Sequence, residues 1–147
     1  MLSEAEAEAL YAERKRLVKI DPDWEASDDY GDLELSGVVE TESGELLTLN
    51  CYLRVDVDPP LFWFDLIYGG TVPIRSLHMD TPHKNPDGEI VGIPHKHRWN
   101  GRHKRWAYSV PDFPRHSINE ALKEFLRECK IEHEGRLPER YNLWGEF

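Results

Sequence analysis

The clearest alternation of apolar and polar positions runs from residue 47 to residue 57. Its apolar members are Leu47, Leu49, Cys51, Leu53, Val55 and Val57, and polar side chains or Tyr52 stand between them. A period of two is typical of a β-strand with one buried face and one solvated face. The pattern therefore predicts a strand here and places Cys51 in the core, not in a nucleophilic role.

Other segments have the length and composition of strands, with turn residues between them. Residues 61–68 are apolar on both faces, which favours a central place in a sheet, and Gly69-Gly70 follows as a tight turn. A loop is expected over 81–92, because residues 85–88 read Asn-Pro-Asp-Gly. The remaining predicted strands are 33–40, 71–80, 94–99 and 102–110.

Two capping boxes predict helices. Ser3 and Glu6 have the required spacing and open a helix expected to reach about Lys19, where Asp-Pro follows. Ser117 and Glu120 open a second helix to about residue 130, with an apolar face that includes Cys129. The tail from residue 134 is expected to dock on the body or to bind a partner. The sequence thus predicts one α+β domain over 1–147, an antiparallel meander of about six strands with one N-terminal and one C-terminal helix.

Composition narrows the class of protein. The net charge is −10, with −12 in residues 1–65 and +2 in residues 66–147. No apolar run approaches the roughly 18 residues of a spanning helix, and the acidic N-terminus lacks a signal pattern. We therefore expect a cytoplasmic protein with no membrane partner. Two cysteines fit reduced, buried thiols better than a disulfide framework.

Residues 78–108 hold five of the seven histidines, together with lysines, arginines and aromatic residues. Asn100-Gly101 predicts a two-residue hairpin turn, which would pair His97 with Lys104 and His95 with Trp106. Directly opposed residues share a face. One face would then present His95, His97, Trp99, Arg102, Lys104, Trp106 and Tyr108. The other would be an ordinary solvated face that includes Lys96, with Arg98 as the exception.

Three chemistries suit such a surface. Histidines supply the base and the acid for cleavage of RNA, cations stabilise the phosphorane, and rings stack bases. A His-x-His pair can also bind zinc or manganese, completed by His78, Asp80 or His83. The third possibility is a structural role. No four-ligand set has familiar spacing, so no tightly bound metal and no cofactor are expected. The candidate catalytic residues are His83, His95 and His97, and the candidate binding residues are Arg98, Trp99, Arg102, Lys104, Trp106 and Tyr108.

The motifs Pro82-His83, Asn85–Gly88, Pro94–His97 and Trp106–Tyr108 resemble those of an uncharacterised family. Its members are small bacterial proteins of prophages and other mobile elements, classed as a domain of unknown function, and the resemblance covers about residues 45–130. The Pro-His loop before a Pro-His strand is also similar to TumE-type toxins of toxin–antitoxin pairs, in which it precedes a strand with one more residue between the histidines. That likeness implies ribonuclease activity.

The sequence therefore favours a toxin-like, metal-independent endoribonuclease or RNA-binding protein of a mobile element, with RNA as its partner. The alternative is a non-enzymatic, acidic inhibitor of the antitoxin or anti-defence type. The protein partners expected are a cognate antitoxin or a host-defence protein. The charge of −12 in residues 1–65 favours this alternative, since an acidic surface can occupy a site meant for nucleic acid.

Overall fold

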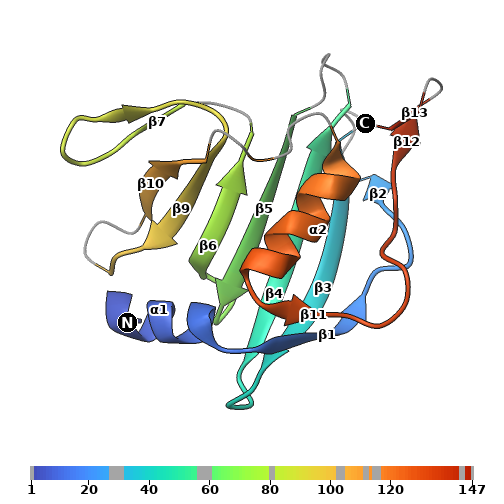
Figure 1. The fold of residues 1–147 in the computed structure, drawn as a ribbon, viewed down its shortest axis with the longest axis horizontal. Helices are drawn as coiled ribbons and strands as arrows, with labels where there is room; N and C mark the ends of the chain where they lie inside the picture. The colour runs from blue at the N-terminus through green and yellow to red at the C-terminus, as the bar shows by residue number, and fades with distance from the viewer. Residues whose placement is uncertain are drawn as a thin grey trace.

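The structure is a computed structural model that describes residues 2–26, 32–55, 61–79, 82–101, 105–110, 113, 117–142 and 145–146. Helices and strands follow one another as Figure 1 shows. The helices are α1 (Glu4–Ala12) and α2 (Ile118–Glu128). The strands are β1 (Lys15–Ile20), β2 (Glu25–Ala26), β3 (Leu33–Thr41), β4 (Leu46–Arg54), β5 (Leu61–Tyr68), β6 (Val72–His78), β7 (His83–Lys84), β8 (Ile90–Val91), β9 (His95–Trp99), β10 (Arg105–Ser109), β11 (Ile131–Glu132), β12 (Tyr141–Asn142) and β13 (Gly145–Glu146).

One nine-stranded sheet organises the molecule. Its order is β10-β9-β6-β5-β4-β3-β1-β11, and β2 pairs with β3 off this path. The neighbours are antiparallel except β11, which runs parallel to β1. The α+β fold class is confirmed, and β3, β4, β5, β6, β9 and β10 form the predicted meander. The sheet is larger than the six strands expected, because β1, β2 and β11 extend it.

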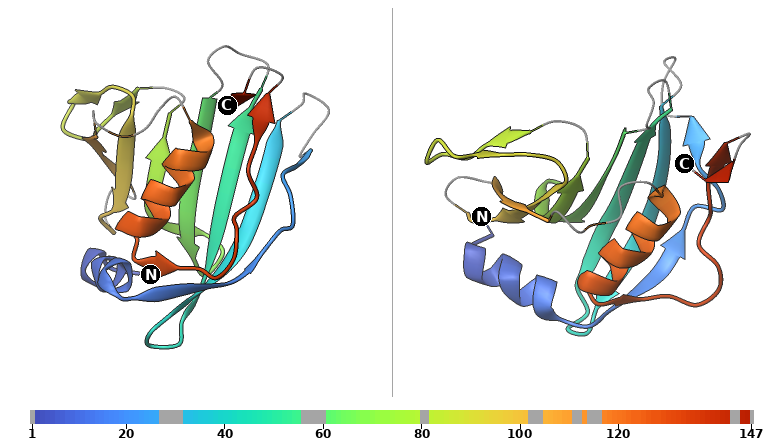
Figure 2. Two further views of the ribbon diagram at one scale, coloured as in Figure 1. Left: turned by 45° about the vertical axis from the view of Figure 1, so that its right-hand side comes forward. Right: turned by 45° about the horizontal axis from the view of Figure 1, so that its top comes forward.

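The core lies between the sheet and α2, which crosses one face of the sheet (Figures 1 and 2). Phe64 of β5 meets Phe125 of α2 with ring centroids 5.7 Å apart. The predicted buried positions of β4 are confirmed, since Leu49 and Leu53 have no exposed surface. Cys51 is also buried there, and burial raises the pKa of its thiol well above the ordinary value. This thiol is therefore part of the core.

The first helix begins as predicted but ends early. Ser3 accepts a hydrogen bond from the Glu6 amide in a complete capping box, and α1 then ends at Ala12, not at Lys19. From Lys15 the chain continues as β1, and this side chain turns back to the end of the helix. Its buried ammonium donates to the carbonyl oxygens of Tyr11, Glu13 and Cys129 at 2.6, 2.8 and 2.7 Å. Pairing of β1 with β3 thus overrides the local helical pattern.

The register of the last hairpin differs from the prediction. Trp99 pairs with Arg105 and His97 with Ala107, so the connection spans residues 100–104 instead of two residues. An odd shift turns every side chain of β10 to the other face. Trp106 therefore pairs with Arg98, on the face opposite His97.

The expected loop 81–92 contains a short hairpin, β7–β8, which Figure 1 shows above β9 and β10. Its turn closes with hydrogen bonds from the Asn85 amide to the Glu89 carbonyl and from the Gly88 amide to the Asn85 carbonyl. The buried side chain of Asn85 then pairs with the backbone of Ala107 in β10. Its Nδ2 donates to the Ala107 oxygen at 2.9 Å, and the Ala107 amide donates to its Oδ1 at 2.8 Å.

The C-terminal segment returns to the body, as one of the two predictions for it stated. Asn119 of α2 exchanges two hydrogen bonds with the backbone of Arg140, at 3.1 and 2.9 Å, and Leu137 packs against the core. In the part of the chain that the structure describes, no helix combines the length and apolar character needed to cross a membrane.

Candidate functional site

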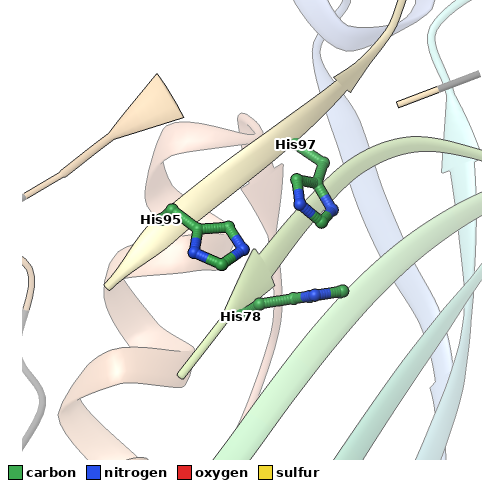
Figure 3. Close-up of side chains that lie close together, drawn as sticks. All are labelled: His78, His95 and His97. Atoms are coloured by element: carbon green, nitrogen blue, oxygen red, sulfur yellow. The ribbon is translucent and has the colours of Figure 1, made fainter. Parts of the chain in front are cut away.

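Two adjacent antiparallel strands bring three histidines to one face of the sheet. His78 of β6 lies directly opposite His95 of β9, and Ser76 lies opposite His97 two residues along. Because paired residues and every second residue share a face, all three imidazoles project to the same side. Figure 3 shows the rings of His78, His95 and His97 turned toward one another. On β5, residues 63 and 65 pair with His78 and Ser76, so Phe64 between them points to the other face, where α2 packs. The histidines therefore lie on the face of the sheet opposite α2.

The three rings are close and withdrawn from water. Ring centroids of His78 and His97 are 4.4 Å apart, and those of His95 and His97 are 4.8 Å apart. His95 and His97 expose 1% and 2% of their surface, and the His78 side chain exposes 16%. One ring nitrogen from each residue lies within 4.8 Å of the other two. Imidazole nitrogens therefore converge in a small buried volume.

A fourth histidine reaches this cluster from outside the main sheet. His83 belongs to β7, and its ring centroid lies 4.5 Å from that of His97 and 6.0 Å from that of His95. The turn at 85–88 and the pairing of Asn85 with Ala107 hold the β7–β8 hairpin in this position. We call His78, His83, His95 and His97 the histidine centre.

Polar groups around the histidine centre fix some of its rings. Nδ1 of His95 lies 3.0 Å from the carbonyl oxygen of Gly92, and donation to this oxygen directs Nε2 into the centre. Asp65 of β5 is 8% exposed, accepts a hydrogen bond from Ser76 Oγ at 2.5 Å and lies 3.6 Å from Nε2 of His78. A carbonyl and a carboxylate behind imidazoles are the usual outer shell of metal-binding histidines.

The arrangement is chemically suited to a transition metal. Zn²⁺ binds histidine nitrogens at about 2.0–2.1 Å, which places tetrahedral ligand atoms about 3.3 Å apart. The histidine nitrogens lie within 4.8 Å of one another, so ring rotations and small shifts of the strands would bring them to that spacing. Catalytic zinc sites have three protein ligands and one open position, which three of these imidazoles would provide. If His83 also bound the metal, all four positions would be filled, as in a structural zinc site.

The residues predicted from sequence fall into separate groups. His83, His95 and His97 come together, whereas Trp106 and Tyr108 lie on the opposite face of β9–β10, where Arg98 was expected, so the single predicted surface is not formed. Trp99 is a core residue with 6% exposure, and its Nε1 donates to the Leu2 carbonyl at 2.7 Å. Arg102 and Lys104 lie outside the described residues.

Lys96 also departs from its prediction. The expected solvated position is 2% exposed, because this face of β9 packs toward α2, where the Lys96 ammonium pairs with Glu128 Oε2. Its nitrogen lies 4.7 Å from the centre of the Phe113 ring. Lys96 therefore stabilises the contact between β9 and α2, and the pattern of one strand does not reveal its partner Glu128.

Sequence reasoning gave His78 only a secondary place and missed Asp65. A usable signal was present, because Ser76 and His78 alternate on one face of the predicted strand 71–80. Pairing that strand antiparallel to 94–99 across the turn at 85–88 would have aligned His78 with His95. Asp65 gave no such signal, since it sits in an apolar run and its role depends on the register of β5 with β6.

A search of curated proteins and a search of solved structures each found no match to the chain. A family model does match, over residues 2–131, and it therefore includes the acidic N-terminal half as well as the histidine motifs. The mobile-element origin and the likeness to TumE-type toxins stay predictions beside this match. By this match the chain belongs to DUF6978, a family of unknown function.

Proposed function

We propose that the protein is a metal-binding protein whose histidine centre holds a divalent transition metal ion, with Zn²⁺ as the first choice. One observation carries the proposal: ring nitrogens of His78, His95 and His97 converge within 4.8 Å at a largely buried position. Neutral imidazole is a good ligand for zinc. Three buried imidazoles this close would repel one another if each carried a proton, and a bound metal ion uses their neutral form.

The outer shell supports the same proposal. The Gly92 carbonyl accepts from the His95 ring and orients it, and the Asp65 carboxylate stands 3.6 Å behind Nε2 of His78. Asp65 also places a negative charge beside a site that would gain two positive charges. A bound Zn²⁺ with one open position would lower the pKa of a bound water and supply a hydroxide nucleophile for hydrolysis.

Zinc titration of the chelator-treated protein tests the proposal. A competing chromogenic chelator should report one equivalent bound. Loss of an outer-shell partner already weakens metal binding by about 10–100-fold, so His97→Ala and His78→Ala should exceed that. The matched control is His133→Ala, because His133 is exposed on a different segment. Absence of stoichiometric binding to Zn²⁺, Mn²⁺ or Co²⁺, or binding that His97→Ala leaves unchanged, would overturn the proposal.

Cleavage of RNA is the second candidate function. It is favoured by the convergence of His83, His95 and His97, whose rings could act as base and acid with or without a metal. A labelled single-stranded RNA, incubated with the protein in chelator and then with added Zn²⁺, distinguishes the two routes. Cleavage in chelator that His97→Ala abolishes supports the metal-independent route, and cleavage only with Zn²⁺ supports the metal-dependent one.

The acidic inhibitor remains the alternative from another class, with an antitoxin-type or host-defence partner. It is supported by the −12 charge of residues 1–65, which supply α1, β1 to β4 and most of β5. Expression in bacteria separates the possibilities. Toxicity that His97→Ala removes favours the enzyme, whereas harmless expression with a stable complex that survives His97→Ala favours the inhibitor.

A further inference from the structure

The other face of β9–β10 holds a second group of side chains that the histidine centre does not use. There Tyr11, Arg75, Arg98, Trp106 and Tyr108, with Glu8, line an open hollow of about 420 Å³. Ligand clefts commonly measure about 300–1,000 Å³ and have aromatic walls with a few polar groups. We call these six residues the aromatic hollow.

A buried arginine holds the walls of the aromatic hollow in place. Arg75 is 5% exposed, and its guanidinium carbon lies 3.6 Å from the centre of the Tyr11 ring. Its Nη1 donates to the Tyr108 hydroxyl at 2.9 Å, and its Nη2 donates to both carboxylate oxygens of Glu8 at 2.9 and 3.0 Å. Both tyrosine rings are thus fixed before any ligand arrives, which lowers the entropic cost of binding.

One donor of Arg75 has no use within the described part of the chain. Its Nε is buried and has no hydrogen-bond acceptor there. This nitrogen is covered by protein atoms, so the part that Arg75 plays in the hollow is to hold its walls through Nη1 and Nη2. The flat rings that line the hollow favour a ligand with a flat face.

One arginine at the rim of the hollow is partly exposed. Arg98 lies directly opposite Trp106 in the β9–β10 ladder, and its side chain is 45% exposed. Glu4 lies 4.0 Å away and its side chain is itself 48% exposed, so water screens the pair. Arg98 therefore presents a partly exposed positive charge beside Trp106.

We propose that the aromatic hollow binds an unpaired nucleobase, with Trp106 stacking on its face and Arg98 contacting its phosphate. A nucleotide combines a π-face with an adjacent anion, which matches the rings of the hollow and the partly exposed Arg98. Stacking on aromatic residues beside arginines is the usual way in which single strands are held. The site is independent of the metal centre, because alternation along β9 points Arg98 and His97 to opposite faces.

The source of the base can be a free nucleotide or a single-stranded RNA, and one assay separates the two. Binding of a fluorescein-labelled 12-nucleotide RNA is followed by anisotropy in chelator at two salt concentrations, with a nucleoside monophosphate as competitor. Trp106→Ala should weaken binding by about 5- to 150-fold, and Trp106→Phe should largely restore it. Arg98→Ala should lower the salt slope by about one, and Arg98→Lys should keep it.

Matched controls lie elsewhere on the sheet. Arg16→Ala removes an exposed arginine of β1, and Trp63→Ala removes a ring from the face that carries the histidine centre. Both should leave binding nearly unchanged, with each variant checked for an unaltered unfolding transition. Competition by the monophosphate that depends on Trp106 identifies a nucleotide site, and strand binding without it identifies a single-strand site. No binding of either ligand, or equal losses in Trp63→Ala and Trp106→Ala, would overturn the proposal. Neither result would bear on zinc binding, which is measured separately.

Discussion

Replacing Asn85 with alanine should loosen the β7–β8 hairpin and separate His83 from the other histidines. The amide of Asn85 makes two buried hydrogen bonds to Ala107, at 2.9 and 2.8 Å. A typical hydrogen bond contributes about 0.5–1.5 kcal/mol net, so the pair contributes about 1–3 kcal/mol to the closed position of the hairpin. Because 1.4 kcal/mol is a factor of ten, the open population should rise by about 5- to 150-fold.

Amide hydrogen exchange at Ala107 measures this effect directly. The Ala107 N–H is bonded to Asn85, not to β9, so its protection reports on the contact between hairpin and sheet. The control is Asp87→Ala, which removes an exposed acceptor for the Glu89 amide in the same turn and should change stability by less than about 0.5 kcal/mol. An unchanged Ala107 exchange rate and an unchanged free energy of unfolding in Asn85→Ala would refute the reasoning. A selective fall in zinc affinity in this variant would show that His83 contributes to the bound metal.

Three further predictions concern stability and reactivity. Leu53→Ala should lower the free energy of unfolding by about 2–5 kcal/mol in a denaturant titration, since Leu53 is fully buried. Lys15→Met should cost about 1–3 kcal/mol because carbonyl oxygens lose a charged donor, while Lys19→Met on the exposed side of β1 should cost little. Burial lowers the pKa of Lys15 to about 8, so the folded protein loses this proton at a lower pH than the unfolded chain. The free energy of unfolding of the wild type should therefore rise relative to that of Lys15→Met from about pH 8 toward pH 10. Burial also raises the pKa of the Cys129 thiol to about 11, so alkylation at pH 8 should be slow until the protein unfolds, and rapid modification of the native thiol would contradict its core position.

The strands of the sheet were predictable because burial on one face produces a period of two that survives in the sequence. Leu47, Leu49 and Leu53 follow this rule, and all are buried. The second helix was predictable for a similar reason, since Ser117 caps α2 and its apolar residues recur on one side. Such features depend on local pattern and on burial, both of which a single sequence records.

The register of β9–β10 could not be predicted in this way, because a distant contact decides it. Asn100-Gly101 has the composition of a two-residue turn, yet a side chain at Gly101 would meet the Glu4 amide nitrogen at 3.3 Å. Trp99 donates to the Leu2 carbonyl beside it. The glycine therefore makes room for the start of α1, and the hairpin connection is longer than the dipeptide suggests. The burial of Lys96 against Glu128 has the same origin, since docking of α2 determines it.

Strand β9 explains why the predicted surface divides into two testable sites. Its alternation sends His95 and His97 to the face with β7 and Asp65, and sends Lys96 and Arg98 to the face with the helices. Substitutions at neighbouring residues of β9 should therefore affect different sites. His97→Ala should alter metal binding and leave nucleobase binding unchanged, and Arg98→Ala should do the reverse. If either variant lost both, the two faces would be coupled through the strand itself, and β9 would have to be treated as one functional element.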